Sequence, residues 1–165
     1  MQIQSLSLII FACFISYLIG SISGGIIVSK LKNIDIRNLG SKNAGGTNAF
    51  RTMGIFFAIL VLLIDLSKGF IATQYIPVFF NFSDSNILIK TFCGIFAILG
   101  HVYPIFFKFK GGKGVGTALG VLLALFPYYY SLTLFTMWLL SLVISGYVGL
   151  SSIVAGLSFP ISYYI

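Results

Sequence analysis

The sequence predicts an all-α integral membrane protein: a polytopic bundle of about six transmembrane helices with its N-terminus outside. Of its 165 residues, 58% are hydrophobic and only 8% are charged, whereas soluble domains carry about 25% charged residues. Several windows of roughly 18 residues or more hold few or no charges, which is long enough to cross a bilayer. This composition excludes an ordinary water-soluble domain.

Six apolar segments are the predicted spans, at residues 3–29, 53–80, 87–107, 115–130, 131–147 and 149–165. The first lacks the basic residues that open a cleavable signal peptide, and its apolar run is too long for one, so we expect it to be retained. The last three spans are separated only by residues 127–131 and 145–149. Tyr and Pro in these breaks suit turns at the membrane interface.

The net charge of +7 is unevenly placed, and its placement predicts the orientation of the chain. Eight of the ten Lys and Arg residues lie in two alternate loops: Lys30, Lys32, Arg37, Lys42 and Arg51, then Lys108, Lys110 and Lys113. The intervening loop, 81–86, contains neither residue type. The positive-inside rule therefore places both cationic loops in the cytoplasm and loop 81–86 outside.

The first cationic loop contains RNLGSKNAGGTNAFRTMG, residues 37–54. Backbone N–H groups beside glycines can form an anion-binding concavity, and Ser, Thr and Asn side chains add donors. The guanidinium of Arg51 has the planar fork that suits phosphate. The alternative is a loop whose basic residues only fix the topology, and composition alone leaves both interpretations open.

The second cationic loop contains FKFKGGKGVGT, residues 107–117. It is not a Walker P-loop, because Gly114 rather than Ser or Thr follows Lys113. A Gly-Gly-Lys-Gly turn at the start of a helix nevertheless presents N–H groups and a positive dipole end to an anion. Lys110 and Lys113 are expected beside it as point charges.

Three ionisable residues within the predicted spans, His101, Asp65 and Lys68, are candidates for a functional role. His101 is the single histidine and is a candidate for proton transfer; the alternative is an imidazole that packs against a neighbouring span. Asp65 and Lys68 share one face of the second span, at positions i and i+3, and are expected to pair. Lys68 also has the reach to contact a cytoplasmic anion.

Small residues within the spans are assigned to packing. Gly20 with Gly24, and Gly116 with Gly120, have the four-residue spacing that allows close helix contact. Cys13 and Cys93 are expected to be small buried side chains rather than a disulfide or metal pair.

Four blocks, in order along the chain, carry a family resemblance: GSKNAGGTNAFR (40–51), DLSKG (65–69), GHVYPIFFKFKGGKGVGT (100–117) and YVGLSSIVA (147–155). The sequence closely resembles the bacterial acyl-phosphate:glycerol-3-phosphate acyltransferase family. The resemblance implies one transmembrane acyltransferase domain over residues 1–165, in the bacterial cytoplasmic membrane, with its active site facing the cytoplasm. It implies transfer of a fatty acyl group from acyl phosphate to the sn-1 hydroxyl of glycerol 3-phosphate, giving lysophosphatidate and phosphate.

The resemblance also implies roles for residues of both loops. The expected substrate phosphate ligands are Ser41, Asn43, Thr47, Asn48, Arg51, Lys68, Lys110, Gly111, Gly112 and Lys113. The expected catalytic residues are His101, Lys113 and Ser41. No metal or cofactor is expected, and the expected partners are both substrates and membrane lipid, with no nucleic acid. Because phosphate is already a good leaving group, positioning and charge stabilisation can supply most of the catalysis.

The sequence departs from the family pattern at its C-terminal end. Family members are expected to continue through a seventh helix into a third motif with His, Asn and Arg, whereas this sequence ends at Ile165. It is thus expected to be a C-terminally short member. Glycines stand at 46 and 116, where Ala is usual, and at 146, where a basic residue is common. The alternative function is a non-catalytic or degenerate membrane protein that binds or conducts phosphate-bearing anions, which explains the cations but not the ordered blocks.

Overall fold

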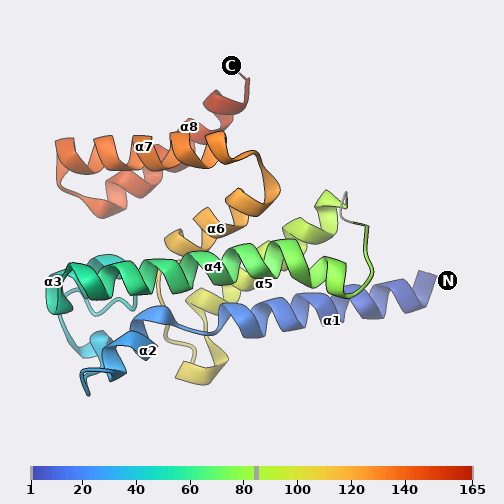
Figure 1. The fold of residues 1–165 in the computed structure, drawn as a ribbon, viewed down its shortest axis with the longest axis horizontal. Helices are drawn as coiled ribbons and strands as arrows, with labels where there is room; N and C mark the ends of the chain where they lie inside the picture. The colour runs from blue at the N-terminus through green and yellow to red at the C-terminus, as the bar shows by residue number, and fades with distance from the viewer. Residues whose placement is uncertain (1, 84–85, 165) are drawn as a thin grey trace. The chain divides into compact units, whose positions relative to one another are not determined.

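The computed structural model describes residues 2–83 and 86–164, and every regular element in these ranges is a helix (Figure 1). This confirms the all-α prediction. The α-helices are α1 (Gln2–Gly20), α2 (Gly24–Lys30), α3 (Gly46–Met53), α4 (Ile55–Phe79), α5 (Ile87–Val102), α6 (Val115–Leu125), α7 (Tyr128–Ser145) and α8 (Val148–Tyr164). Two short 3-10 helices are η1 (Ile36–Asn38) and η2 (Ile105–Phe107). The chain forms two compact units, Met1–Leu125 and Phe126–Ile165.

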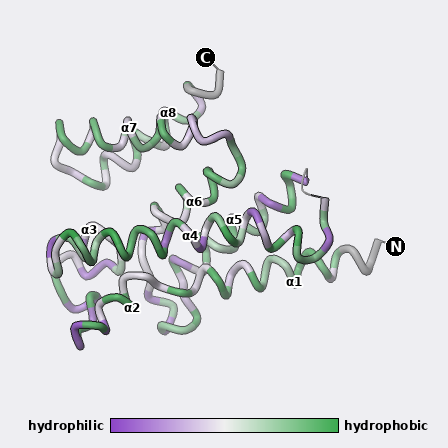
Figure 2. The backbone as a smooth tube through the Cα atoms, viewed as in Figure 1, coloured by the Kyte–Doolittle hydropathy of each residue, from purple (hydrophilic) through white to green (hydrophobic). Residues whose placement is uncertain are grey.

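Six apolar helical segments correspond to the six predicted spans. Within the described residues, four are long and apolar enough to cross a membrane: Leu6–Lys30, Ile55–Phe79, Ile87–Phe107 and Tyr128–Ser145. Val115–Leu125 and Val148–Ile161 are shorter apolar helices. Figure 2 shows hydrophobic residues along α1 and α4 and hydrophilic residues around the turns near α2 and α3. Many large apolar side chains on these helices are exposed, as expected for surfaces that face lipid rather than water.

Among the predicted boundaries that needed correction, proline and glycine explain two. The span predicted at 115–130 is too long, because α6 ends at Leu125 and Pro127 stands as the extended N-cap of α7. Proline has no N–H to continue a preceding helix but suits the start of a new one. The span predicted from residue 53 begins at Ile55, since Gly54 has a φ of 96°. Residues 84–85 of the predicted exterior loop and residue 165 lie outside the described residues.

The central helix of the first unit is α4, which contacts α1, α2, α3, α5 and α6. Glycines bring the backbones together. A Cβ added at Gly69 of α4 would overlap the carbonyl oxygen of Thr117, and one at Gly120 of α6 would overlap that of Leu66. Gly20 of α1 lies equally close to Ala97 of α5. The predicted close helix packing is therefore confirmed at Gly20 and Gly120.

The second unit is a hairpin of α7 and α8, which lie side by side in Figure 1. Gly146 ends α7 with a φ of 70°, and its N–H donates to the carbonyl of Leu142, as in a left-handed helix cap. The indole Nε1 of Trp138 lies 3.3 Å from the hydroxyl of Ser152 and joins the two helices. The ring of Phe159 packs against Phe126, with 5.0 Å between centroids.

The contact between α4 and α6 generates a stability prediction. Gly120→Ala should lower the free energy of unfolding by roughly 1–3 kcal/mol, because the added methyl group overlaps a backbone atom that cannot move alone. The matched control is Gly156→Ala, at a helical glycine of α8 where a Cβ would meet nothing within 4 Å. Thermal unfolding in detergent measures both, and equal stability of the two variants would contradict the close approach.

Candidate functional site

A buried cluster of charged and polar side chains joins α4 to the end of α5. The Lys68 Nζ lies 3.1 Å from Asp65 Oδ1, and His101 Nδ1 lies 3.4 Å from the same oxygen. The three residues are 2–4% exposed. The predicted pairing of Asp65 with Lys68 is confirmed. The 3.4 Å contact to His101 is long for a hydrogen bond, so we describe it only as a polar contact between the ring nitrogen and the carboxylate.

The same cluster binds the backbone where the first span is interrupted between α1 and α2. The backbone N–H of Gly24 lies 3.3 Å from Asp65 Oδ1, and Lys68 Nζ donates to the carbonyl of Ile22 at 2.7 Å. Residues 21–23 lie outside regular helix, so some of their backbone groups lack the usual helical partners. Asp65 and Lys68 supply hydrogen-bond partners to this backbone. The backbone groups in turn satisfy the two buried charges and so lower the free-energy cost of burying them.

His101 packs against the glycines of the second cationic loop. A Cβ added at Gly112 would overlap the imidazole Nε2, and one at Gly111 would overlap the His101 carbonyl oxygen. The N–H groups of Gly111 and Gly112 donate to the carbonyls of Val102 and His101, each at 3.2 Å. These donors therefore cap α5. The two N–H groups, expected to bind phosphate, are thus hydrogen-bonded within the protein, and close packing accounts for the two glycines.

The lysines of the second loop remain at the surface. Lys110 and Lys113 are exposed, and neither forms an ion pair with any residue that the structure describes. Gly114 has a φ of 82° and stands immediately before α6, a conformation that glycine adopts without steric cost. The turn thus holds the two lysines at the start of α6.

The first cationic loop is organised around one buried amide, that of Asn48. The residue lies in α3, a helix that we did not predict. Its Nδ2 lies 2.9–3.1 Å from three carbonyl oxygens, and its Oδ1 accepts a hydrogen bond from the N–H of Ser41 at 2.9 Å. The carbonyls belong to Ile36, Leu39 and Asn43. Asn48 was expected to bind phosphate, but its amide is committed to the loop backbone, where it positions Ser41.

The other predicted residues of the first loop are accessible. Ser41 and Arg51 are exposed, while Asn43 and Thr47 are half-buried. No ion pair to Arg51 occurs among the described residues. A hydroxyl, an amide and an unpaired guanidinium are groups that bind phosphate oxygens.

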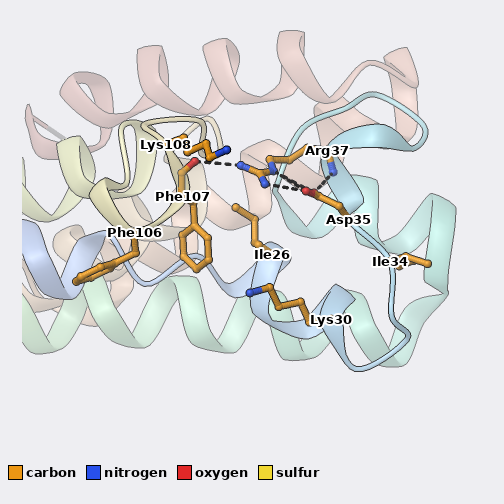
Figure 3. Close-up of a pocket in the computed structure, with 8 residues that line it drawn as sticks. All are labelled: Ile26, Lys30, Ile34, Asp35, Arg37, Phe106, Phe107 and Lys108. Atoms are coloured by element: carbon orange, nitrogen blue, oxygen red, sulfur yellow. Dashed lines mark hydrogen bonds and ion pairs between the residues drawn. The ribbon is translucent and has the colours of Figure 1, made fainter.

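One arginine that the sequence analysis did not assign joins the two cationic loops (Figure 3). Arg37 Nη1 donates to the carbonyl of Phe107 at 3.0 Å, and its remaining nitrogens contact Asp35 at 2.7–3.2 Å. The hydrogen bond from Arg37 holds the pKa of the Asp35 carboxyl below its ordinary value. The Asp-x-Arg spacing was visible in the sequence, but its partner, a carbonyl 70 residues away, was not.

The three predicted catalytic residues are not joined to one another. Within the described chain, no hydrogen bond or ion pair links His101 to Ser41 or Lys113. His101 is buried, whereas Ser41 and Lys113 are exposed. Lys68, predicted as a phosphate ligand, is buried on Asp65. The structure therefore separates an interior supporting cluster from the exposed groups of the loops.

A pocket of about 190 Å³ lies beside the loops (Figure 3). It is lined by Ile26, Lys30, Ile34, Asp35, Arg37, Phe106, Phe107 and Lys108. None of the residues predicted to bind substrate lines this pocket, so it is distinct from the candidate substrate groups.

The buried pair generates a prediction on stability. Asp65→Asn should lower the free energy of unfolding by about 3–5 kcal/mol, because the change leaves the buried Lys68 charge without its carboxylate. Asp35→Asn is the matched control. It should lower the free energy of unfolding by only about 0–1 kcal/mol, since the pair of Asp35 with Arg37 is partly exposed. Thermal unfolding in detergent compares the two. An Asp65→Asn protein as stable as the control would show that the buried cluster does not support the fold.

Comparisons with known proteins agree with this architecture. The family model for glycerol-3-phosphate acyltransferase matches residues 10–165. The glycerol-3-phosphate acyltransferase of Aquifex aeolicus (strain VF5) is 46% identical over 155 residues, which cover 94% of this chain and 77% of that protein. The enzyme of the same name from Chlorobium phaeobacteroides is 44% identical, over 89% of this chain and 66% of its own.

Two crystal structures of PlsY (YgiH), an integral membrane glycerol 3-phosphate acyltransferase, share the fold. The glycerol 3-phosphate form has a TM-score of 0.84 and 41% identity, over 94% of this chain and 76% of that one. The lysophosphatidic acid form has a TM-score of 0.83 and 40% identity, with the same coverage. The chain is thus an integral membrane protein, and it belongs to the glycerol-3-phosphate acyltransferase family.

Proposed function

We propose that this chain transfers a fatty acyl group from acyl phosphate to the sn-1 hydroxyl of glycerol 3-phosphate. The observation that carries the proposal is the juxtaposition of two cationic loops, tied by Arg37 to the Phe107 carbonyl, in a chain of this family. The related PlsY structures are of a glycerol 3-phosphate form and a lysophosphatidic acid form. These molecules are an acceptor and a product of the proposed reaction, and they support acyl transfer over the non-catalytic alternative.

Exposed and half-buried groups of the two loops are the proposed ligands of the substrate phosphates. They are Ser41, Asn43, Thr47, Arg51, Lys110 and Lys113. Charge-assisted contacts from Arg and Lys are the stronger ones and suit a dianionic phosphate. The remaining residues expected to bind phosphate are proposed to support these ligands instead. Asn48 positions Ser41, and Gly111 and Gly112 pack on His101. Lys68 supports the same region through Asp65.

The proposed chemistry needs no covalent enzyme intermediate. The glycerol hydroxyl oxygen bonds to the acyl carbon, the bond from that carbon to the phosphate oxygen breaks, and phosphate leaves. The hydroxyl proton passes to a phosphate oxygen, so atoms and charge balance. Lys113 and Arg51 stabilise the negative charge on the departing phosphate, which is the electrostatic contribution expected of preorganised cations. Buried His101 serves as a positioning residue that supports Gly112.

We propose that residues 1–165 act as one transmembrane domain in the bacterial cytoplasmic membrane, with the N-terminus outside and both cationic loops in the cytoplasm. Phosphate substrates made in the cytoplasm then reach the loops directly, and the acyl chain lies in the bilayer. The positive-inside rule supports this orientation. Single cysteines at positions 42 and 110, in a background without Cys13 and Cys93, should be labelled only from the cytoplasmic side. Labelling of either position from outside would contradict the proposed cytoplasmic location of the two loops.

Donor choice tests the proposed reaction. The purified chain should form radiolabelled lysophosphatidate from labelled glycerol 3-phosphate and an acyl phosphate, and form none with the acyl-CoA of the same chain length. Turnover with acyl-CoA would overturn the proposed donor. Retained glycerol 3-phosphate binding without turnover on either donor would instead favour the non-catalytic alternative.

The exposed cations generate a further prediction. Arg51→Ala, Lys110→Ala and Lys113→Ala should each weaken glycerol 3-phosphate binding by roughly ten- to a hundredfold, since a charge-assisted hydrogen bond contributes about 1.5–3 kcal/mol. Lys42→Ala is the control, because Lys42 is an exposed cation of the same loop outside the proposed ligand set. Calorimetric titration in detergent measures all four. If all four variants bound glycerol 3-phosphate with the same affinity, the three cations would serve only to set the membrane topology.

A further inference from the structure

The pocket beside the loops is built by three segments that are distant in the sequence. Ile26 and Lys30 come from α2, Asp35 and Arg37 from the stretch that enters η1, and Phe107 from η2. Its volume is about 190 Å³, several times the roughly 30 Å³ that one water molecule occupies in the liquid. The pocket therefore has room for a polar group larger than water.

The pocket carries two positive charges that no carboxylate balances. Its lining contains Lys30, Arg37 and Lys108 against the single carboxylate of Asp35, which leaves a net charge of 3 − 1 = +2. Asp35 is already paired with Arg37 at 2.7 Å. Lys30 and Lys108 are exposed, and in the described ranges neither forms an ion pair. An anion entering the pocket would meet two lysines free to bind it.

Apolar and aromatic side chains stand next to these lysines. Lys30 is the last residue of the apolar segment Leu6–Lys30, and its Nζ lies 5.7 Å from the centre of the Phe107 ring. Phe106, in the same lining, is 59% exposed. A lysine at the end of an apolar span, flanked by aromatic rings, is typical of the depth at which lipid headgroups lie.

We propose that this pocket binds the phosphate-bearing headgroup of an anionic membrane phospholipid. A basic pocket at the end of membrane helices recognises such headgroups by charge, and the apolar lining favours a lipid over a free phosphate compound, which would need no such wall. The site is separate from the groups proposed to bind the substrates, and it does not depend on the proposed reaction. Because Arg37 and Phe107 both line it, a bound lipid would brace the junction of the two loops.

The test measures lipid binding to the whole chain in detergent by native mass spectrometry. The probes are phosphatidylglycerol, which is anionic, and phosphatidylcholine with the same acyl chains, which is zwitterionic. The pocket variant is Lys30→Gln with Lys108→Gln. The matched control is Lys32→Gln with Lys42→Gln, which removes the same charge from exposed residues that do not line the pocket.

The pocket variant should bind phosphatidylglycerol about ten- to thirtyfold more weakly than the unaltered chain, while the control should change by less than about threefold. The charge-conserving variant Lys30→Arg with Lys108→Arg should retain the affinity. If the double Gln variant fails to fold, as judged by circular dichroism and size exclusion, the two single Gln variants replace it, each with an expected loss of about fivefold.

Three results would overturn the proposal. Unchanged affinity in the pocket variant would show that the lysines do not bind the headgroup, and equal losses in pocket and control variants would show attraction by general surface charge. Displacement of phosphatidylglycerol by glycerol 3-phosphate would assign the pocket to a soluble phosphate instead of a lipid.

Discussion

The buried carboxylate of Asp65 is the constraint on which the first unit of this protein depends. An ionised group placed among membrane helices must find partners inside the protein. Asp65 finds the Lys68 ammonium, the His101 ring and the N–H of Gly24, while Gly116 lies close to its Cβ. These partners belong to α2, α4, α5 and α6, so one charge fixes the places where four helices begin, end or cross.

The accessible groups proposed to bind substrate stand on loops that interior contacts hold in place. Buried Asn48 fixes the course of the first loop, and Gly112 seats the second loop on His101. Arg37 then links the two loops through the Phe107 carbonyl. All of these contacts are made within the protein, and holding the binding groups in this way lowers the ordering cost of binding, which is the condition for catalysis by positioning.

Features that depend on composition and local spacing could be predicted from the sequence. Features that depend on contacts between residues distant in the chain could not. Hydropathy identified the six apolar helical segments, and the i, i+3 spacing identified the pair of Asp65 and Lys68. Helix α3 has only eight residues, fewer than the roughly 11 over which helical periodicity becomes a usable signal. The sequence suggested that the glycine N–H groups of the second loop could donate to an anion. In the folded chain they donate hydrogen bonds to carbonyls at the end of α5, and the sequence alone does not show that these groups are neighbours.

The contact between Gly112 and His101 also limits how this protein can change during evolution. Every amino acid other than glycine carries a Cβ, and at this position any Cβ would overlap the imidazole Nε2. Any single replacement here therefore requires the buried His101 ring to shift, whatever the polarity or size of the new side chain. A change at position 112 is therefore tolerated only together with a movement or a replacement of His101, so the two positions are expected to vary together.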